Sequence, residues 1–273
     1  MTGRLADVPA PLVKVIVMTP LLVHLPHDST LIPPDERADF LLPDDELARE
    51  SLRLTDAHTA DLYAEGCPSD DFLRAPVSRL VVDVERFADD DREPCARIGM
   101  GATYVRTCEG RPLRALTPAR REELMRRYYW PHHHALEAAA TERLARFGRC
   151  VILDAHSYPT GPLPTQSAFG RSPEIGIGTE AMHTPPELCR WAEDFFRVRG
   201  FDVGLDTPFS GAMVPRRYFG HDPRVQSLMI EVRRDLYMDE ATGERHEGFD
   251  WMRRSLTDFR KALVVRSAAL GPE

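Results

Sequence analysis

The sequence lacks the features that mark membrane-spanning and nucleic-acid-binding proteins. No apolar run approaches the roughly 20 residues needed to cross a bilayer, and residues 1–10 lack the basic and then apolar pattern of a signal peptide. The net charge is −8 and the pI is near 5.7, so the chain as a whole has no basic excess for binding phosphates. We therefore expect no membrane partner and no nucleic-acid partner.

Cysteine is scarce, and its spacing argues against a disulfide framework. The five residues are odd in number and scattered, and they contain no Cys-x-x-Cys pair. They are Cys67, Cys95, Cys108, Cys150 and Cys189. Such a pattern is typical of reduced thiols, and it predicts a cytoplasmic protein.

Internal repeats and low-complexity linkers are also missing, while the overall composition is ordinary. Hydrophobic residues make up 42% of the chain and charged residues 29%, as in soluble globular proteins. A length of 273 residues suits one large α/β domain, and length alone allows two. Because no linker divides the sequence, we predict a single domain over residues 1–273.

Five short apolar runs predict buried strands. Most are rich in Val and Ile, and each is bounded by polar or turn residues, as in the strands of a mostly parallel sheet. The runs are residues 13–18, 80–84, 150–153, 201–205 and 228–232. Residues 33–45 and 88–93 have the composition of loops.

Helical patterns lie between these runs. Thr117 and Pro118 supply the N-cap and first-turn proline of a helix that runs to Phe147 and stops at Gly148, with a kink or break expected at Pro131. Residues 184–187 have the spacing of a capping box for a second helix that ends at residue 200. A third pattern covers residues 249–270. The alternation predicts a three-layer α/β sandwich with a mixed, mostly parallel central sheet.

Four polar clusters lie where strand patterns end, which is where ligand sites of α/β sheets occur. They are residues 25–30, 81–86, 154–158 and 230–235. Taken alone, each has an ordinary explanation, since a histidine or arginine after a strand is commonly structural or solvated. Glu231 differs because it lies inside an apolar strand, where an unpaired carboxylate is costly unless it faces a metal or a cation.

Together the clusters supply the groups that metal-assisted hydrolysis needs. Two histidines and a carboxylate are a normal ligand set for catalytic zinc and leave one position for water. The metal lowers the pKa of that water to about 7, and a second carboxylate can take its proton. An arginine can hold a substrate carboxylate through two hydrogen bonds. This inventory fits hydrolysis of an N-acyl amino acid, although the same ligands also suit Fe(II), Mn or Co.

Five segments match, in order, the motifs of one enzyme family. The segments are residues 26–33, 81–86, 128–136, 154–157 and 229–240. The family's own patterns at these places are, in the same order, Pro-His-x-Gly-Thr-x-x-Pro, Val-x-Asp-Leu-Asn-Arg, Tyr-Trp-x-Pro-Tyr-His-x-x-Leu, Asp-x-His-Ser and Gln-Leu-Glu-x-x-x-x-Leu-Tyr-Met-Asp-Glu. The chain thereby resembles the N-formylglutamate amidohydrolases and, more distantly, the zinc carboxypeptidases and aspartoacylase. The resemblance implies a phosphorylase/hydrolase-like fold and hydrolysis of an N-formyl amino acid such as N-formylglutamate, with one zinc ion per chain.

The resemblance also assigns roles to single residues. It implies that His27 and His156 are zinc ligands, that Glu231 is the general base, and that Arg86 clasps the substrate carboxylate. Asp154 lies two residues before His156, so its side chain points to the same face and is predicted to orient that ring.

The third ligand departs from the carboxypeptidase pattern. Those enzymes place a ligand glutamate three residues after the first histidine, where this chain has Thr30. Asp56 matches an aspartate that recurs in amidohydrolase relatives, and we predict it as the ligand. Asp28 and His58 are the alternatives.

Two further segments carry candidate residues. In the triplet of residues 132–134, three consecutive rings cannot share one helix face, so we assign a catalytic role to His133, at the family's histidine position, and surface or capping roles to its neighbours. Residues 209–218 resemble a glycine-rich, substrate-covering loop of the family, with Arg216 or Arg217 as its cation. A solvated basic loop is the alternative interpretation.

Glu85 stands where the family motif has asparagine. If that asparagine helps to hold the substrate, a negative charge weakens carboxylate binding or favours a cationic group, so a peptide or specialised metabolite is an alternative substrate. A degenerate relative that binds without catalysis is disfavoured because both histidines and Glu231 remain. A serine hydrolase using Ser157 lacks the Gly-x-Ser-x-Gly turn.

Overall fold

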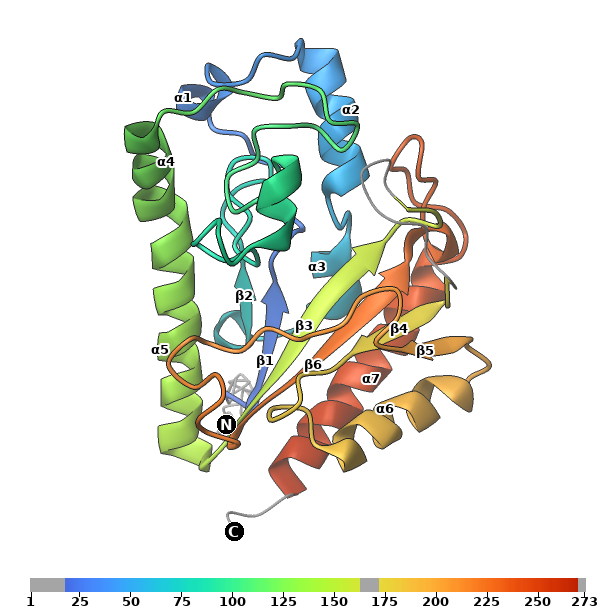
Figure 1. Ribbon diagram of the computed structural model, residues 1–273. Coiled ribbons are helices and arrows are strands. Elements are labelled where there is room, and N and C mark those ends of the chain that lie inside the picture. Colours follow the sequence, from blue (N-terminus) through green and yellow to red (C-terminus); the bar gives the residue numbers. More distant parts are fainter. Residues whose placement is uncertain (1–17, 163–171, 270–273) are drawn as a thin grey trace, which may run out of the picture.

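The computed structural model describes residues 18–162 and 172–269, which are built around a six-stranded sheet (Figure 1). The strands are β1 (Leu21–Leu25), β2 (Phe72–Arg74), β3 (Cys150–Tyr158), β4 (Ile175–Gly178), β5 (Val203–Leu205) and β6 (Val225–Arg233). Their order in space is β2-β1-β3-β6-β4-β5. The first four are parallel, whereas β4 is antiparallel to β6 and parallel to β5. The predicted α/β class with a mixed, mostly parallel sheet is confirmed.

Three of the predicted runs form strands, namely residues 150–153 in β3, 201–205 around β5 and 228–232 in β6. Residues 13–17 lie outside the described residues, and the first described strand is β1. The prediction of a strand at residues 80–84 is wrong, because this stretch forms turns. Its apolar side chains are buried in a second cluster, and Arg114 donates to the carbonyl of Val81 in place of a sheet partner.

The helices agree with the predicted ends in most places. They are α1 (Pro34–Arg37), α2 (Asp44–Leu54), α3 (Thr59–Tyr63), α4 (Pro118–Leu124), α5 (Trp130–Phe147), α6 (Pro186–Arg197) and α7 (Phe249–Ala269). Short 3-10 turns cover Ser69–Asp71, Pro94–Ile98 and Arg234–Leu236. In the described part of the chain, none of the helices has the length and apolarity that a membrane crossing requires.

The long helical pattern before β3 is interrupted where the sequence indicated. The Arg120 N–H donates to the hydroxyl of Thr117, and Gly148 ends α5 with a φ of 71°. A π-helical turn, Met125–Tyr129, separates α4 from α5 just before Pro131. A proline in the second position of α5 lacks an N–H to donate, so the irregular turn before it accommodates the predicted break.

Two local predictions are wrong. The capping box is not formed, because α6 has Pro185 as its N-cap and the hydroxyl of Thr184 instead donates to the carbonyl of Ser227 at 2.6 Å. Residues 33–45 are not a plain loop, since they contain α1 and the start of α2. The hydroxyl of Thr184 is therefore bonded to a strand instead of capping its own helix.

The two faces of the sheet carry different helices, and Figure 1 shows the resulting layers. Leu153 and Leu228 pack in the largest apolar cluster with Phe259 of α7. Ile152, one position earlier on β3, packs with Ala140 of α5 in a separate cluster. Because successive strand residues point to opposite faces, one apolar run supplies both layers.

Arg143 of α5 ties this helix to the edge of the sheet. Its side chain is 0% exposed, pairs with Asp71 at 2.9 Å, and donates to the carbonyl of Leu21 at the start of β1. Removal of one partner from a buried pair leaves the other charge uncompensated.

We expect Arg143→Met to lower the free energy of unfolding by about 3–5 kcal/mol. Arg146 is exposed near the end of the same helix, so Arg146→Met is the matched control, with an expected change within about 0.5 kcal/mol. Urea unfolding measures both values. Equal effects of the two substitutions would contradict a structural role for the buried pair.

Candidate active site

The alternation of β3 places polar side chains on the α5 face as the strand approaches its carboxyl end. Asp154 and His156 follow Ile152 at a spacing of two and therefore share its face. In the register of the parallel strands, His156 pairs with Glu231 of β6, and Asp154 pairs with His24 of β1. All four polar side chains are buried, with 0–6% of their surface exposed. Titratable groups thus meet in a site largely closed to solvent.

His27, Asp56 and His156 converge beside this edge of the sheet. The Nδ1 atom of His156 lies 3.0 Å from Asp56 Oδ2, and Nδ1 of His27 lies 3.6 Å from the same oxygen. One ligand atom from each of the three residues lies within 4.8 Å of the others. Nδ1 of His27 is buried and has no hydrogen-bond partner. Two imidazoles, one of them with an unpartnered nitrogen, and a carboxylate fit a divalent metal such as zinc.

The other edge of the His27 ring is held by Asp83. Nε2 of His27 donates to Asp83 Oδ1 at 2.9 Å, so Nδ1 is left as the free acceptor. Asp83 also accepts from the guanidinium of Arg79 and from the hydroxyl of Tyr104. Burial opposes the charge of Asp83, but Arg79 and His27 outweigh it and hold the carboxyl pKa well below its usual range. An ionised carboxylate behind a ligand histidine fixes its ring orientation.

Arg234 holds the carboxylate of Asp56. Its guanidinium donates to Asp56 Oδ1 at 2.9 Å and to the carbonyls of Arg53 and Ser157. Despite the cost of burial, the neighbouring His156 and His27 rings and the charge of Arg234 hold the pKa of Asp56 well below its usual range. Asp56 therefore presents an ionised oxygen to both histidines.

The alternative ligands lie elsewhere. Asp28 accepts hydrogen bonds from Thr59 and from the backbone of Ala60. His58 donates to the carbonyl of Gly243. Among the described residues, neither belongs to a potential ligand group.

Glu231 places a carboxyl group in this buried region. Its Oε2 is buried and has no hydrogen-bond partner. Burial raises the pKa of this carboxyl to about 7, against the opposing attraction of His156. A carboxyl with a pKa near neutrality can both accept and return a proton.

A cavity of about 890 Å³ opens onto these groups. His27, Asp56, His156 and Glu231 line it together with Arg86. The Nε atom of Arg86 is buried without a hydrogen-bond partner and lies 3.7 Å from Asp83 Oδ2. The arrangement places a cation in the same cavity as the potential metal ligands.

The structure separates the two arginines of the 209–218 segment. Arg216 lines the cavity. The side chain of Arg217 is 64% exposed, lies 3.7 Å from Glu137, and does not line the cavity. Only Arg216 is therefore placed to meet a ligand there.

The histidine triplet differs from the expectation at one position. His132 is buried, with Nε2 at 2.9 Å from Nε2 of His24, so its predicted surface or capping role is wrong. His133 lines the cavity and donates from Nε2 to the carbonyl of Val84. Burial and the neighbouring His24 lower the pKa of His133 to about 4, so it is neutral at pH 7. His134 is exposed.

Glu85 also faces the cavity, at a distance of 3.2 Å from Nε2 of His156. With His24 and Asp154 it forms a second potential ligand group. The closest atoms in that group already pair with each other, since Nδ1 of His24 donates to Asp154 at 2.8 Å. The group of His27, with its unpartnered nitrogen, is the better metal site.

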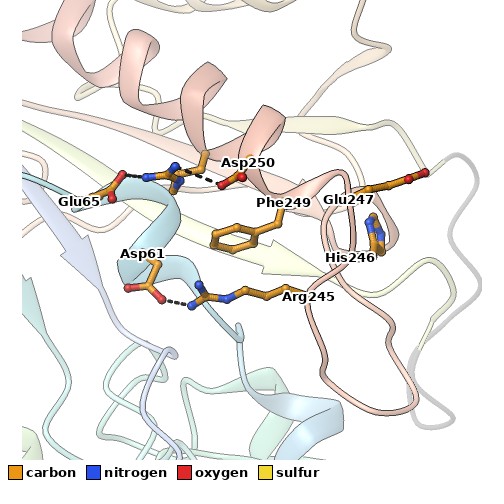
Figure 2. A pocket seen from close by; sticks show the side chains of 8 residues that line it. Asp61, Glu65, Arg245, His246, Glu247, Phe249 and Asp250 are labelled. Carbon is orange, nitrogen blue, oxygen red and sulfur yellow. Dashed lines mark hydrogen bonds and ion pairs between the residues drawn. The ribbon is translucent and has the colours of Figure 1, made fainter.

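A second hollow, of about 430 Å³, lies between α3 and the start of α7 (Figure 2). Figure 2 shows Arg245 directed at Asp61 beside the ring of Phe249. Asp250 and Glu65 both pair with Arg253. The charges of both arginines are compensated there. The reactive groups lie in the larger cavity.

Comparisons with known proteins show the family of this chain. The model of the N-formylglutamate amidohydrolase family matches residues 19–238. The chain belongs to this family. Its predicted family and its class of enzyme, an amidohydrolase, are thereby confirmed. All the residues named above as lining the larger cavity lie within the matched range.

Individual relatives share most of their length with the chain. N-formylglutamate deformylases of Pseudomonas aeruginosa and Pseudomonas putida are 29% and 28% identical, over 81% of this chain and 83% of theirs. The crystal structure of N-formylglutamate amidohydrolase from Ralstonia eutropha superposes with a TM-score of 0.78 at 28% identity, covering 91% of this chain and 94% of that one. The Agrobacterium tumefaciens protein Atu2144 shares the fold, with a TM-score of 0.60 at 20% identity.

Loss of one of the three potential ligands should abolish metal binding. We expect wild-type protein to carry about one zinc per chain and His156→Ala to lose it, because three protein ligands are the usual set of a catalytic zinc site. Native mass spectrometry measures the occupancy. His58→Ala is the control, since His58 belongs to no potential ligand group within the described residues. Zinc retained in the His156 variant would contradict the assignment.

Proposed function

We propose that this amidohydrolase is a zinc-dependent N-formylglutamate deformylase, with zinc held by His27, Asp56 and His156. The observation that carries the proposal is the unpaired, buried carboxyl of Glu231 beside three converging ligand atoms, one of which has no partner. The names of the relatives support the substrate. The donor set supports zinc, and other divalent metals suit it as well.

A zinc ion at this position would make a water more acidic and stabilise negative charge on the substrate carbonyl oxygen. Glu231 would accept the proton of the attacking water and then pass it to the leaving amine nitrogen. Its pKa of about 7 suits both transfers. His156 is held in place by Asp56 on one edge and lies 3.3 Å from Asp154 on the other.

N-formylglutamate carries two carboxylates, and two arginines of the cavity are placed for them. Arg86 and Arg216 line the same cavity. Charge-assisted hydrogen bonds from arginine to carboxylate fix both position and orientation. His133 stays a proposed catalytic residue. It lines the cavity, and its Nε2 proton is engaged by the carbonyl of Val84.

One observation favours a second candidate substrate. Glu85 lies next to Arg86 and lines the cavity with 18% of its side chain exposed. A carboxylate there favours a substrate with a cationic group, such as a short peptide or a specialised metabolite. Rates for N-formylglutamate, N-formyl-lysine and short peptides distinguish the candidates, because a preference for the cationic compounds would displace N-formylglutamate.

Glu231→Gln tests the base. We expect kcat for N-formylglutamate to fall by about 10²–10⁴-fold, since glutamine cannot accept the proton, while zinc content stays at the wild-type level. A kcat within a factor of about three of wild type would contradict the role.

Thermal unfolding of the metal-free proteins is the control for folding. The folded-state pKa of Glu231 is about 7, above its ordinary value of 4.5. Its ionisation therefore lowers stability as pH rises between these values, and the loss is complete above pH 7. A neutral glutamine avoids this loss, so we expect the variant's Tm at pH 8 to equal or exceed that of wild type.

The two arginines of the 209–218 segment form a matched pair. We expect Arg216→Ala to raise KM for N-formylglutamate by about 10–100-fold, from the loss of one charge-assisted contact. Arg217→Ala should leave KM unchanged because its side chain lies outside the cavity. Steady-state kinetics measures both, and an equal rise in the two variants would indicate a general charge effect instead.

A further inference from the structure

A buried chain of polar contacts runs from helix α5 to His156. Nε2 of His132 lies 2.9 Å from Nε2 of His24 on β1. Nδ1 of His24 lies 2.8 Å from Asp154 Oδ1 on β3, and that oxygen lies 3.3 Å from Nε2 of His156. All four side chains are at most 4% exposed. The chain thus links three separate elements through side chains that are almost entirely buried.

The chemistry of the groups fixes the direction of these hydrogen bonds. An ionised carboxylate only accepts, so Nδ1 of His24 donates to Asp154. In a neutral ring the other nitrogen is then the acceptor, and Nε2 of His132 must donate to it. Burial, with the neighbouring His24, lowers the pKa of His132 to about 2, which keeps that ring neutral. With both rings neutral, one proton arrangement satisfies the contacts among His132, His24 and Asp154.

The second oxygen of Asp154 is held from the opposite side. It accepts from the backbone N–H of Met213 at 2.7 Å, and the carbonyl of Met213 accepts from Ser227 of β6. Met213 lies three residues before Arg216, and both line the cavity. The orientation of the Asp154 carboxylate therefore depends on His24 at one oxygen and on this segment at the other.

We propose that His24, supported by His132, is a positioning residue that acts on His156 through Asp154. The inference rests on the proposed role of His156 as a ligand. When Nδ1 of His156 faces the metal, its Nε2 carries the proton and needs an acceptor. The partly exposed Glu85 lies at 3.2 Å, and Asp154 Oδ1 lies at 3.3 Å and is buried in the sheet. His24 locks that oxygen in place. Without the Nδ1–H of His24, Asp154 loses a neutralising donor and the freedom of the His156 ring increases.

Two substitutions at His24 separate positioning from packing. In His24→Asn the side-chain amide nitrogen takes roughly the place of Nδ1 and still donates to Asp154. In His24→Gln it takes roughly the place of Nε2, and the donor to Asp154 is lost. Both variants remove the same buried ring, so a purely structural role predicts equal effects of the two substitutions on activity.

We expect His24→Gln to lower kcat by about 10–100-fold and to weaken zinc affinity by a similar factor. KM should stay within about twofold of wild type, because the substitution removes no contact with the substrate carboxylates. His24→Asn should recover most of both losses. Steady-state kinetics gives kcat and KM, and competition with a chelator gives zinc affinity independently of turnover. His183→Asn and His183→Gln are controls at another buried histidine, which bonds to the carbonyl of Val225 and does not line the cavity.

Equal losses in both His24 variants would overturn the positioning role while leaving the proposed function intact. Wild-type activity in both would overturn it as well. If wild type binds zinc but does not hydrolyse N-formylglutamate, the proposed function fails. The zinc affinities then decide the inference by themselves, and weak binding in His24→Gln but not in His24→Asn supports it. A wild type that binds no zinc overturns both.

Discussion

The site depends on the cost of burying charge at the carboxyl edge of the sheet. Asp56, Asp83 and Asp154 are each at most 2% exposed, and each is compensated by histidine or arginine donors. A buried carboxylate without such partners would be protonated or would destabilise the fold. Pairing therefore fixes the carboxylates, and the carboxylates in turn fix the rings of His27 and His156.

Against this background of paired groups, two atoms stand out. Nδ1 of His27 and Oε2 of Glu231 are buried and have no hydrogen-bond partner. An unsatisfied acceptor and an unsatisfied carboxylate are unfavourable in a folded protein unless they serve a ligand or a reaction. Their position in one cavity with Arg86 gives the family's hydrolytic chemistry a physical basis in this chain.

The sequence alone determined the parts of the fold and site that depend on local pattern. The period-two alternation of β3 put Asp154 and His156 on one face, and the cap at Thr117 and the stop at Gly148 bounded a long helical stretch. Motif order indicated the family, which the match over residues 19–238 confirmed. These features could be predicted because each is encoded within a few neighbouring residues.

Only the tertiary structure decided which polar groups meet. Residues 80–84 look like a strand, yet they form buried turns in which Arg114 donates to the backbone carbonyl of Val81. His132 contacts His24 across 108 positions, and Arg234 contacts Asp56 across 178. Local pattern carries no signal for such pairs, since packing of the helices on the sheet brings them together. Burial then makes every unpaired charge costly, and this cost selects the partners.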